Sequence, residues 1–98
     1  MNILNSINIP KNGENFTTLL NYKNIKIVRI ISSNILDTNQ YIQNEDEWIL
    51  IIEGKATIKM NNKEYNLIKG DTLFIPSQTE HIINSVESGT IWLAIHIY

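Results

Sequence analysis

The stretch EWILIIEGKATIKMNNKEYNLIKGDTLFIP, Glu47–Pro76, consists of short runs of aliphatic and β-branched residues that are separated by turn residues. The turns are marked by Gly54, by the pair Asn61 and Asn62, and by Gly70. Asparagine tolerates positive φ, so the paired asparagines suit a two-residue hairpin. No helical periodicity runs through the stretch. It therefore predicts antiparallel strands joined by tight turns.

The same pattern continues on both sides of this stretch. The strands that we expect are Asn24–Ile31, Glu47–Glu53, Lys55–Met60, Lys63–Ile68, Thr72–Ile75, His81–Val86 and Thr90–Tyr98. The third of these alternates apolar and polar residues, which is typical of a strand with one buried and one solvated face. About seven strands at intervals of about ten residues predict an all-β sandwich or barrel.

The segment Trp48–Ile52 differs from its neighbours because both of its faces are apolar. If one face packs in the interior, the other also needs cover, and we expect a second copy of the chain to supply it. The protein is therefore expected to be a homodimer. Trp48 and Trp92 are expected to be packing or interface residues, as large aromatic residues in strands usually are.

The chain has 98 residues, of which 43% are hydrophobic. This is enough for one compact domain with a core and too little for two. We expect a β-barrel domain over residues 24–98. Residues 1–23 form an N-terminal segment, for which we expect an edge strand and one short helical turn within Gly13–Leu20.

Composition excludes several classes of partner. The formal net charge is −2, and Arg29 is the single arginine, so the basic cluster that nucleic-acid binding needs is missing. No run approaches the roughly 20 apolar residues of a membrane span. No cysteine is present, which fits a reducing compartment. The start of the chain lacks the pattern of a signal peptide, and we expect a cytoplasmic protein.

Polar residues lead into the apolar strand at its start. Tyr41, Gln43, Glu47 and Ile49 all occupy alternate positions of one extended segment, and so share a face. If this face points into a barrel, a phenol, an amide and a carboxylate lie at its mouth and aliphatic side chains lie deeper. We expect the intervening pair Glu45-Asp46 to form a solvated acidic turn.

Two motifs in this region resemble those of the cupin family. Glu47, six further residues and Gly54 are similar to the second half of the first cupin motif, which usually begins with His-x-His. Gly70, Pro76 and His81, in GDTLFIPSQTEH, are similar to the second cupin motif. The order and short spacing of the two motifs also fit, and the chain looks like a small single-domain cupin of unassigned activity.

The resemblance implies a double-stranded β-helix, or jelly roll, with a divalent metal such as zinc, manganese, iron or nickel inside the barrel. The family's metal ligands are the two histidines and the glutamate of the first motif and the histidine of the second. Glu47 and His81 carry over unchanged, whereas Tyr41 and Gln43 stand at the positions of the two motif-one histidines. We therefore expect Gln43, Glu47 and His81 as metal ligands and Tyr41 in the pocket wall.

The loss of both motif-one histidines leaves a donor set richer in oxygen, which weakens binding of the metals that prefer imidazole. Two hypotheses follow. The protein binds a divalent metal and a small polar molecule, as a metal-dependent oxygenase, isomerase or lyase does. Alternatively, it is a non-catalytic binding or sensing module with a degenerate metal site. The sequence assigns no catalytic residue.

The remaining candidates lie on other strands. Ile49 and Phe74 are expected to line the pocket. His96 could face the barrel beside His81, although a histidine of a terminal strand is more often at the surface or in a dimer contact. Arg29 could anchor an anionic ligand if its strand face points inward. An ion pair with a neighbouring strand is the role that we expect for it.

Overall fold

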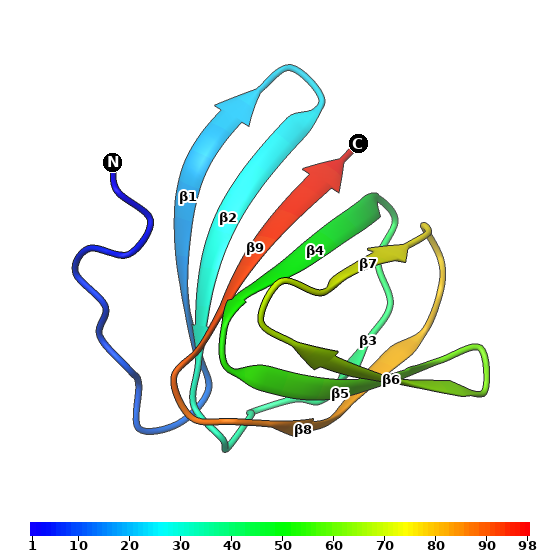
Figure 1. Ribbon diagram of the computed structural model, residues 1–98. Helices are drawn as coiled ribbons and strands as arrows, with labels where there is room; N and C mark the ends of the chain where they lie inside the picture. Colours follow the sequence, from blue (N-terminus) through cyan, green and yellow to red (C-terminus); the bar gives the residue numbers. More distant parts are fainter.

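The computed structural model describes residues 1–98, and all of its regular structure is β (Figure 1). The strands are β1 (Glu14–Tyr22), β2 (Ile25–Ser32), β3 (Gln40–Tyr41), β4 (Asp46–Glu53), β5 (Lys55–Met60), β6 (Lys63–Ile68), β7 (Thr72–Ile75), β8 (His81–Val86) and β9 (Thr90–Ile97). The all-β prediction is confirmed. None of the chain forms a helix long and apolar enough to cross a membrane.

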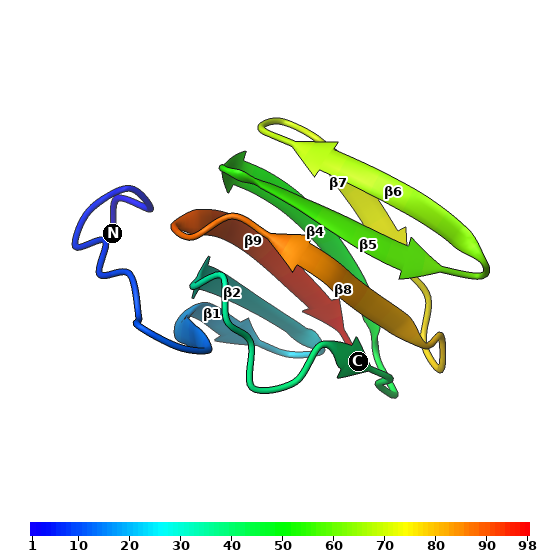
Figure 2. The ribbon, with the colours of Figure 1, turned by 90° about the horizontal axis from the view of Figure 1, so that it is seen from below.

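The strands form two sheets that face each other (Figures 1 and 2). The larger has the order β1-β2-β9-β4-β7 and the smaller has the order β3-β8-β5-β6, and every pairing is antiparallel. Consecutive strands β4 and β5 belong to different sheets, as do β6 and β7, and β8 and β9. This repeated crossing between sheets gives the predicted jelly roll.

The turn residues mark the strand ends well. The hairpin between β5 and β6 turns at Asn61 and Asn62, whose φ angles are 53° and 60°. Positive φ at both central residues is the geometry that favours paired asparagines. The hairpin prediction is therefore confirmed.

The helical turn that we expected within Gly13–Leu20 is wrong. These residues lead into and form most of β1, which pairs with β2 from Glu14 opposite Ser32 to Tyr22 opposite Ile25. The hydrogen bonds of a neighbouring strand decide the conformation here, because the segment has no apolar helical face of its own. β1 is an edge strand of the larger sheet.

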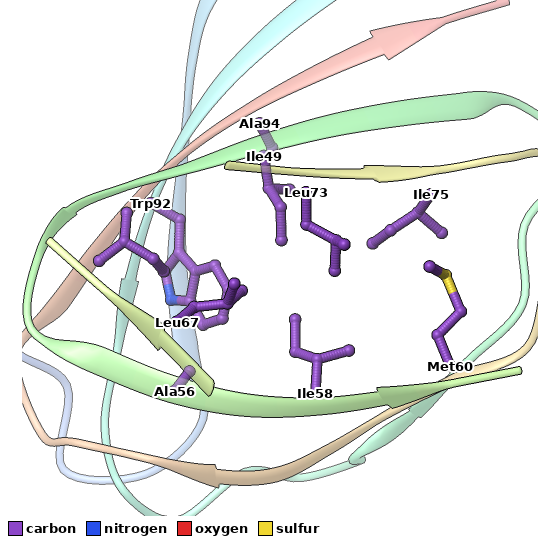
Figure 3. Packing of buried hydrophobic residues seen from close by; sticks show 10 residues of the cluster. Ile49, Ala56, Ile58, Met60, Leu67, Leu73, Ile75, Trp92 and Ala94 are labelled. Carbon is purple, nitrogen blue, oxygen red and sulfur yellow. The ribbon is translucent and has the colours of Figure 1, made fainter. Parts of the chain in front are cut away.

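The core lies between the sheets and contains ten buried residues (Figure 3). They are Ile49, Ile51, Ala56, Ile58, Met60, Leu67, Leu73, Ile75, Trp92 and Ala94. Figure 3 shows the β5 side chains pointing toward those of β7. The strict alternation of burial along β4 and β5 follows from the twofold period of a strand. Each fully buried aliphatic side chain contributes about 1.5–3 kcal/mol to stability.

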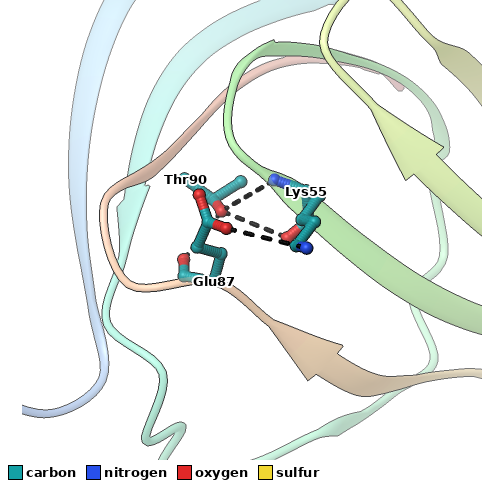
Figure 4. A network of polar contacts seen from close by, with 3 residues as sticks. All are labelled: Lys55, Glu87 and Thr90. Carbon is teal, nitrogen blue, oxygen red and sulfur yellow. Dashed lines mark hydrogen bonds and ion pairs between the residues drawn. The ribbon is translucent and has the colours of Figure 1, made fainter.

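The corner at which the chain passes from β4 to β5 depends on Gly54. Its φ is 89°, and a Cβ at this position would lie 2.8 Å from the Cα atom of Thr90. Thr90 is fully buried, and its Oγ1 accepts a hydrogen bond from the backbone N–H of Lys55 at 3.3 Å (Figure 4). The same hydroxyl lies 2.7 Å from the carbonyl oxygen of Glu87, to which it can donate. The corner is therefore tied to the β8–β9 turn.

Neither role considered for Arg29 is found. The side chain is 4% exposed, and its Nη1 donates hydrogen bonds to the carbonyl oxygens of Ile3 at 3.0 Å and Asn5 at 2.7 Å. Its Nη2 donates to the carbonyl oxygen of Ser6 at 3.4 Å. Arg29 therefore fastens the N-terminal segment to β2 instead of pairing with a carboxylate or reaching a ligand pocket.

Candidate functional site

A cavity of about 120 Å³ lies between the two sheets. Its walls come from β1, β2, β3, β4, β5, β7, β8 and β9, together with the segment that connects β3 to β4. The lining residues are Glu14, Phe16, Ile30, Tyr41, Gln43, Glu47, Ile49, Ile58, Ile75, His81, Ile83, Trp92 and His96. Phe16 is 65% exposed, so the cavity reaches solvent beside it. Most of the wall is apolar, and the polar groups are few.

Glu47 lies on β4, and its side chain lines the cavity while remaining 7% exposed. Its Oε1 accepts a hydrogen bond from Gln43 Nε2 at 2.9 Å. Its Oε2 lies 3.7 Å from His96 Nε2, which is too long for a hydrogen bond. Glu47 and His96 are direct cross-strand partners of β4 and β9, and this register brings them together. One oxygen of a buried carboxylate is thus left without a donor.

His81 begins β8 and is 5% exposed. Its Nδ1 lies 3.2 Å from the carbonyl oxygen of Thr79. A carbonyl oxygen can only accept, so Nδ1 carries the hydrogen in this contact and Nε2 keeps its lone pair. The ring stacks on that of Tyr41, with centroids 5.5 Å apart, because the two residues are register partners of β3 and β8.

Tyr41 places its hydroxyl 2.8 Å from the carbonyl oxygen of Thr38 and 3.3 Å from Glu14 Oε1. Burial raises the pKa of the Tyr41 phenol well above its ordinary value, and the negative charge of Glu14 raises it further. The phenol therefore stays protonated at neutral pH and acts as a hydrogen-bond donor.

Glu14 is a residue of the cavity wall that was not predicted from the sequence. Its Oε2 accepts a hydrogen bond from Ser32 Oγ at 2.7 Å, and Ser32 Oγ accepts one from Trp92 Nε1 at 2.9 Å. Glu14 and Ser32 face each other across β1 and β2. The alternation of Glu14 and Phe16 on one strand face would have indicated this site if the edge strand expected within residues 1–23 had been placed at β1.

The expectation for Glu45 needs correction. Glu45 does not belong to a solvated turn: its side chain is 14% exposed, and its Oε2 lies 3.0 Å from His96 Nδ1. Of the two alternatives for His96, the structure supports the position in the cavity wall, because its side chain is 17% exposed and lines the cavity. Its Nδ1 nevertheless makes no aligned hydrogen bond. Asp46 points away, accepting a hydrogen bond from the backbone N–H of Ser77 at 2.8 Å.

The expected role of Phe74 in the pocket wall is wrong. Phe74 is 49% exposed and stands opposite Trp48 on the outer face of the larger sheet. The register of β7 with β4 pairs Ile75 with Glu47, so the next residue along the chain, Ile75, takes the inward position. Ile49, also expected in the wall, is 4% exposed and does line the cavity.

The side chains present do not form the metal site that the resemblance to the cupin family implies. Gln43 turns its Nε2, which carries hydrogens, toward Glu47, so its amide acts as a donor and not as a ligand. No group of three or more His, Asp or Glu side chains converges as a metal site needs. Glu47 and His81 are thus brought to one cavity without completing a set of metal ligands.

Two solved structures of other proteins are similar to this chain. A candidate mannose-6-phosphate isomerase of Ralstonia eutropha JMP134 has the same fold, with a TM-score of 0.89 and 28% identity over 99% of this chain and 95% of that chain. A cupin superfamily protein of Desulfitobacterium hafniense DCB-2 has a TM-score of 0.80 and 20% identity, over 93% of this chain and 83% of that one. Both show the double-stranded β-helix.

The family follows from the sequence match. Residues 38–96, more than half of the chain, match the cupin domain family. The uncharacterized protein MJ1618 of Methanocaldococcus jannaschii is 30% identical in an alignment over 87 residues that covers 80% of this chain and 67% of that protein. The chain belongs to the cupin family.

Proposed function

We propose that the cavity binds a small organic molecule directly, without a resident metal. The observation that carries this proposal is the state of Glu47: its carboxylate is buried in the cavity wall, and only one of its two oxygens accepts a hydrogen bond. Oε2 has no hydrogen-bond donor from the chain and is still reached by solvent. A ligand that donates a hydrogen bond to this oxygen would replace water at a carboxylate that the protein otherwise encloses.

The other polar groups offer the ligand hydrogen-bond acceptors. In its neutral form, His81 carries a lone pair on Nε2 and accepts there, because Nδ1 is engaged with Thr79. The one hydrogen of the Tyr41 hydroxyl is engaged with the carbonyl oxygen of Thr38 or with Glu14, so its oxygen can accept from the ligand. Eight of the thirteen lining residues are hydrophobic, which gives the ligand an apolar surface to pack against. An apolar wall with a few oriented polar groups is typical of small-molecule sites.

The size of the cavity limits the ligand. A volume of about 120 Å³ is slightly smaller than a cavity of about 150 Å³ that accepts benzene. The ligand, or the part of it that is buried, therefore has only a few non-hydrogen atoms. We propose a binding or sensing role and assign no reaction.

A divalent metal such as zinc, manganese, iron or nickel is the second candidate, and the orientation of His81 favours it. Histidines that bind metals usually donate their other N–H to a carbonyl or carboxylate, as Nδ1 does here. Glu47 and His81 would hold the ion, and Gln43 would join them only if its amide turned to present its oxygen. In that case the protein would be a metal-dependent enzyme.

The test of the first proposal is a thermal-shift screen of chelator-treated protein against a panel of small metabolites of each charge class. A ligand that binds the native state raises the melting temperature by mass action. We expect at least one compound to raise it in the wild type and to lose the effect in Glu47→Gln. A flat panel would overturn the proposal.

Homodimerisation through the outer face of the larger sheet is also proposed. Trp48 and Leu50 are only half-buried there, and Phe74 is 49% exposed beside them. Sedimentation of the wild type and of Phe74→Ser tests this, with a dimer expected only in the wild type. A monomeric wild type would contradict it.

We also propose a cytoplasmic location, because the lack of cysteine fits a reducing compartment.

A further inference from the structure

The cavity has an unbalanced charge. Two carboxylates, those of Glu14 and Glu47, belong to its wall, and Glu45 lies directly behind His96. No lysine or arginine is among the thirteen lining residues. Arg29, the only arginine of the chain, is occupied by the carbonyl oxygens of the N-terminal segment. A ligand that enters the cavity therefore meets negative charge without a fixed counter-charge.

The unpaired Oε2 of Glu47 is an independent observation that points to the same ligand. The residue is 7% exposed, and its Oε2 has no hydrogen-bond donor. An ionised carboxylate that is removed from water needs a cation or several donors. Gln43 supplies one donor to Oε1, and nothing in the chain supplies the second.

Two tyrosines respond to this negative field. Burial is the main cause of the raised pKa of Tyr41, and the charges of Glu14 and Glu47 raise it further. The pKa of Tyr98 is also raised, first by burial and then by Glu45 and Glu47. The negative charges that disfavour the phenolate form of a tyrosine would stabilise any positive group placed among these carboxylates.

The aromatic part of the wall also suits a cation. Phe16, Tyr41 and Trp92 all line the cavity. A cation above the face of such a ring is attracted to its π-electrons, most strongly in sites that exclude water. A neutral or anionic ligand lacks this electrostatic attraction.

We propose that the ligand of this cavity is a small organic cation, an ammonium compound whose N–H groups donate to Glu47 Oε2 while its carbon atoms pack against the apolar wall. This inference rests on the proposed function and adds the chemical class of the ligand. Glu14 lies in the same wall and adds to the attraction at longer range. A preference for cations excludes a phosphorylated sugar, which the name of the R. eutropha relative suggests as a ligand. Its phosphate group would enter an acidic cavity that has no basic residue to bind it.

Protonated His96 is the competing source of positive charge, since its ring lies between Glu45 and Glu47. The variant His96→Gln removes this competition, and the titrations are run at pH 8, where alkylammonium ions remain charged. The other groups that face this ring are the Tyr98 ring, at 6.4 Å between centroids, and the cavity itself.

The test compares three probes of nearly equal size and different charge: propylammonium, propan-1-ol and propionate. Each is titrated at pH 8 into chelator-treated protein while the indole N–H signals of both tryptophans are followed by NMR. Trp92 lines the cavity and Trp48 lies on the outer sheet face, so the second signal is an internal control. We expect propylammonium alone to shift the Trp92 signal, with the Trp48 signal unchanged.

Three variants sharpen the result. Glu47→Gln keeps the size of the side chain and should weaken propylammonium binding about tenfold or more, because it removes the charge that the ammonium group contacts. Glu14→Gln should weaken it less. Glu64→Gln, an exposed residue of β6 outside the cavity, makes the same charge change and should have no effect.

The outcomes separate this inference from the proposed function. Binding of propan-1-ol or propionate as tight as that of propylammonium would overturn the cation class and leave a ligand-binding cavity. If none of the three shifts Trp92, a neutral or anionic hit in the metabolite panel would likewise overturn only the class. A flat titration together with a flat panel would overturn both.

Discussion

The two ends of the space between the sheets are built from the same strands but differ in what they contain. At one end, the inward positions are occupied by buried apolar side chains such as Ile51, Ala56 and Leu67. At the other, the inward positions include Glu47 and His81, and a cavity remains. The apolar end therefore stabilises the fold, whereas the cavity end is less stabilising because it keeps polar groups at inward positions.

The largest effect should come from truncating the apolar end. Ile51→Ala removes a side chain that is 1% exposed and should lower the free energy of unfolding by about 2–5 kcal/mol. Glu47→Gln, at the cavity end, should change it by less than about 1 kcal/mol, because the new amide oxygen can still accept the hydrogen bond of Gln43. Chemical denaturation of both variants makes the comparison. Equal losses would show that the two ends are not energetically distinct.

The corner beside the apolar end offers a matched pair of glycines. Gly54 and Gly70 have the same φ of 89°, so alanine at either position meets a similar backbone penalty of about 1–2 kcal/mol. Only at Gly54 would the added Cβ also collide with Thr90, whereas nothing lies within 4 Å at Gly70. Gly54→Ala should therefore be the more destabilising by at least about 1 kcal/mol in thermal or chemical unfolding. The opposite order would contradict the packing described for this corner.

A smaller effect should appear at the cavity end at alkaline pH. The pKa of Tyr41 is raised in the folded protein, whereas in the unfolded chain it has its ordinary value of 10.0. Above about pH 10 the unfolded chain releases this proton and the native state keeps it, so the stability that is fully present below this pH is lost as the pH rises. Denaturation midpoints measured from pH 9 to pH 11 should fall less steeply in Tyr41→Phe than in the wild type. Parallel curves would show that the Tyr41 phenol does not experience the field of the cavity.

The sequence predicts the apolar end better than the cavity end, and the reason is the range of the interactions. Gly54, Asn61 and Asn62 act through local backbone geometry, and they mark strand ends without knowledge of neighbours. Alternation along β5 likewise identifies Ala56 as a core residue. These features depend on residues that are close together in the chain.

The cavity depends on registers between distant strands. The cupin motifs identify Glu47 and His81, which the fold does bring to one cavity. Glu14 reaches it only because β1 pairs with β2. Phe74 is turned outward by the pairing of β7 with β4, which no local pattern reveals. The burial of Glu45 likewise depends on β9, through His96.

The central claim, that the cavity acts without a resident metal, is tested most directly by elemental analysis of untagged protein. The wild type and His81→Ala would each be incubated with manganese, zinc, iron and nickel salts and then freed of unbound ions. We expect far less than one metal ion per chain in both proteins. Near-stoichiometric metal in the wild type that is lost in His81→Ala would contradict it and make the metal-dependent enzyme the better description.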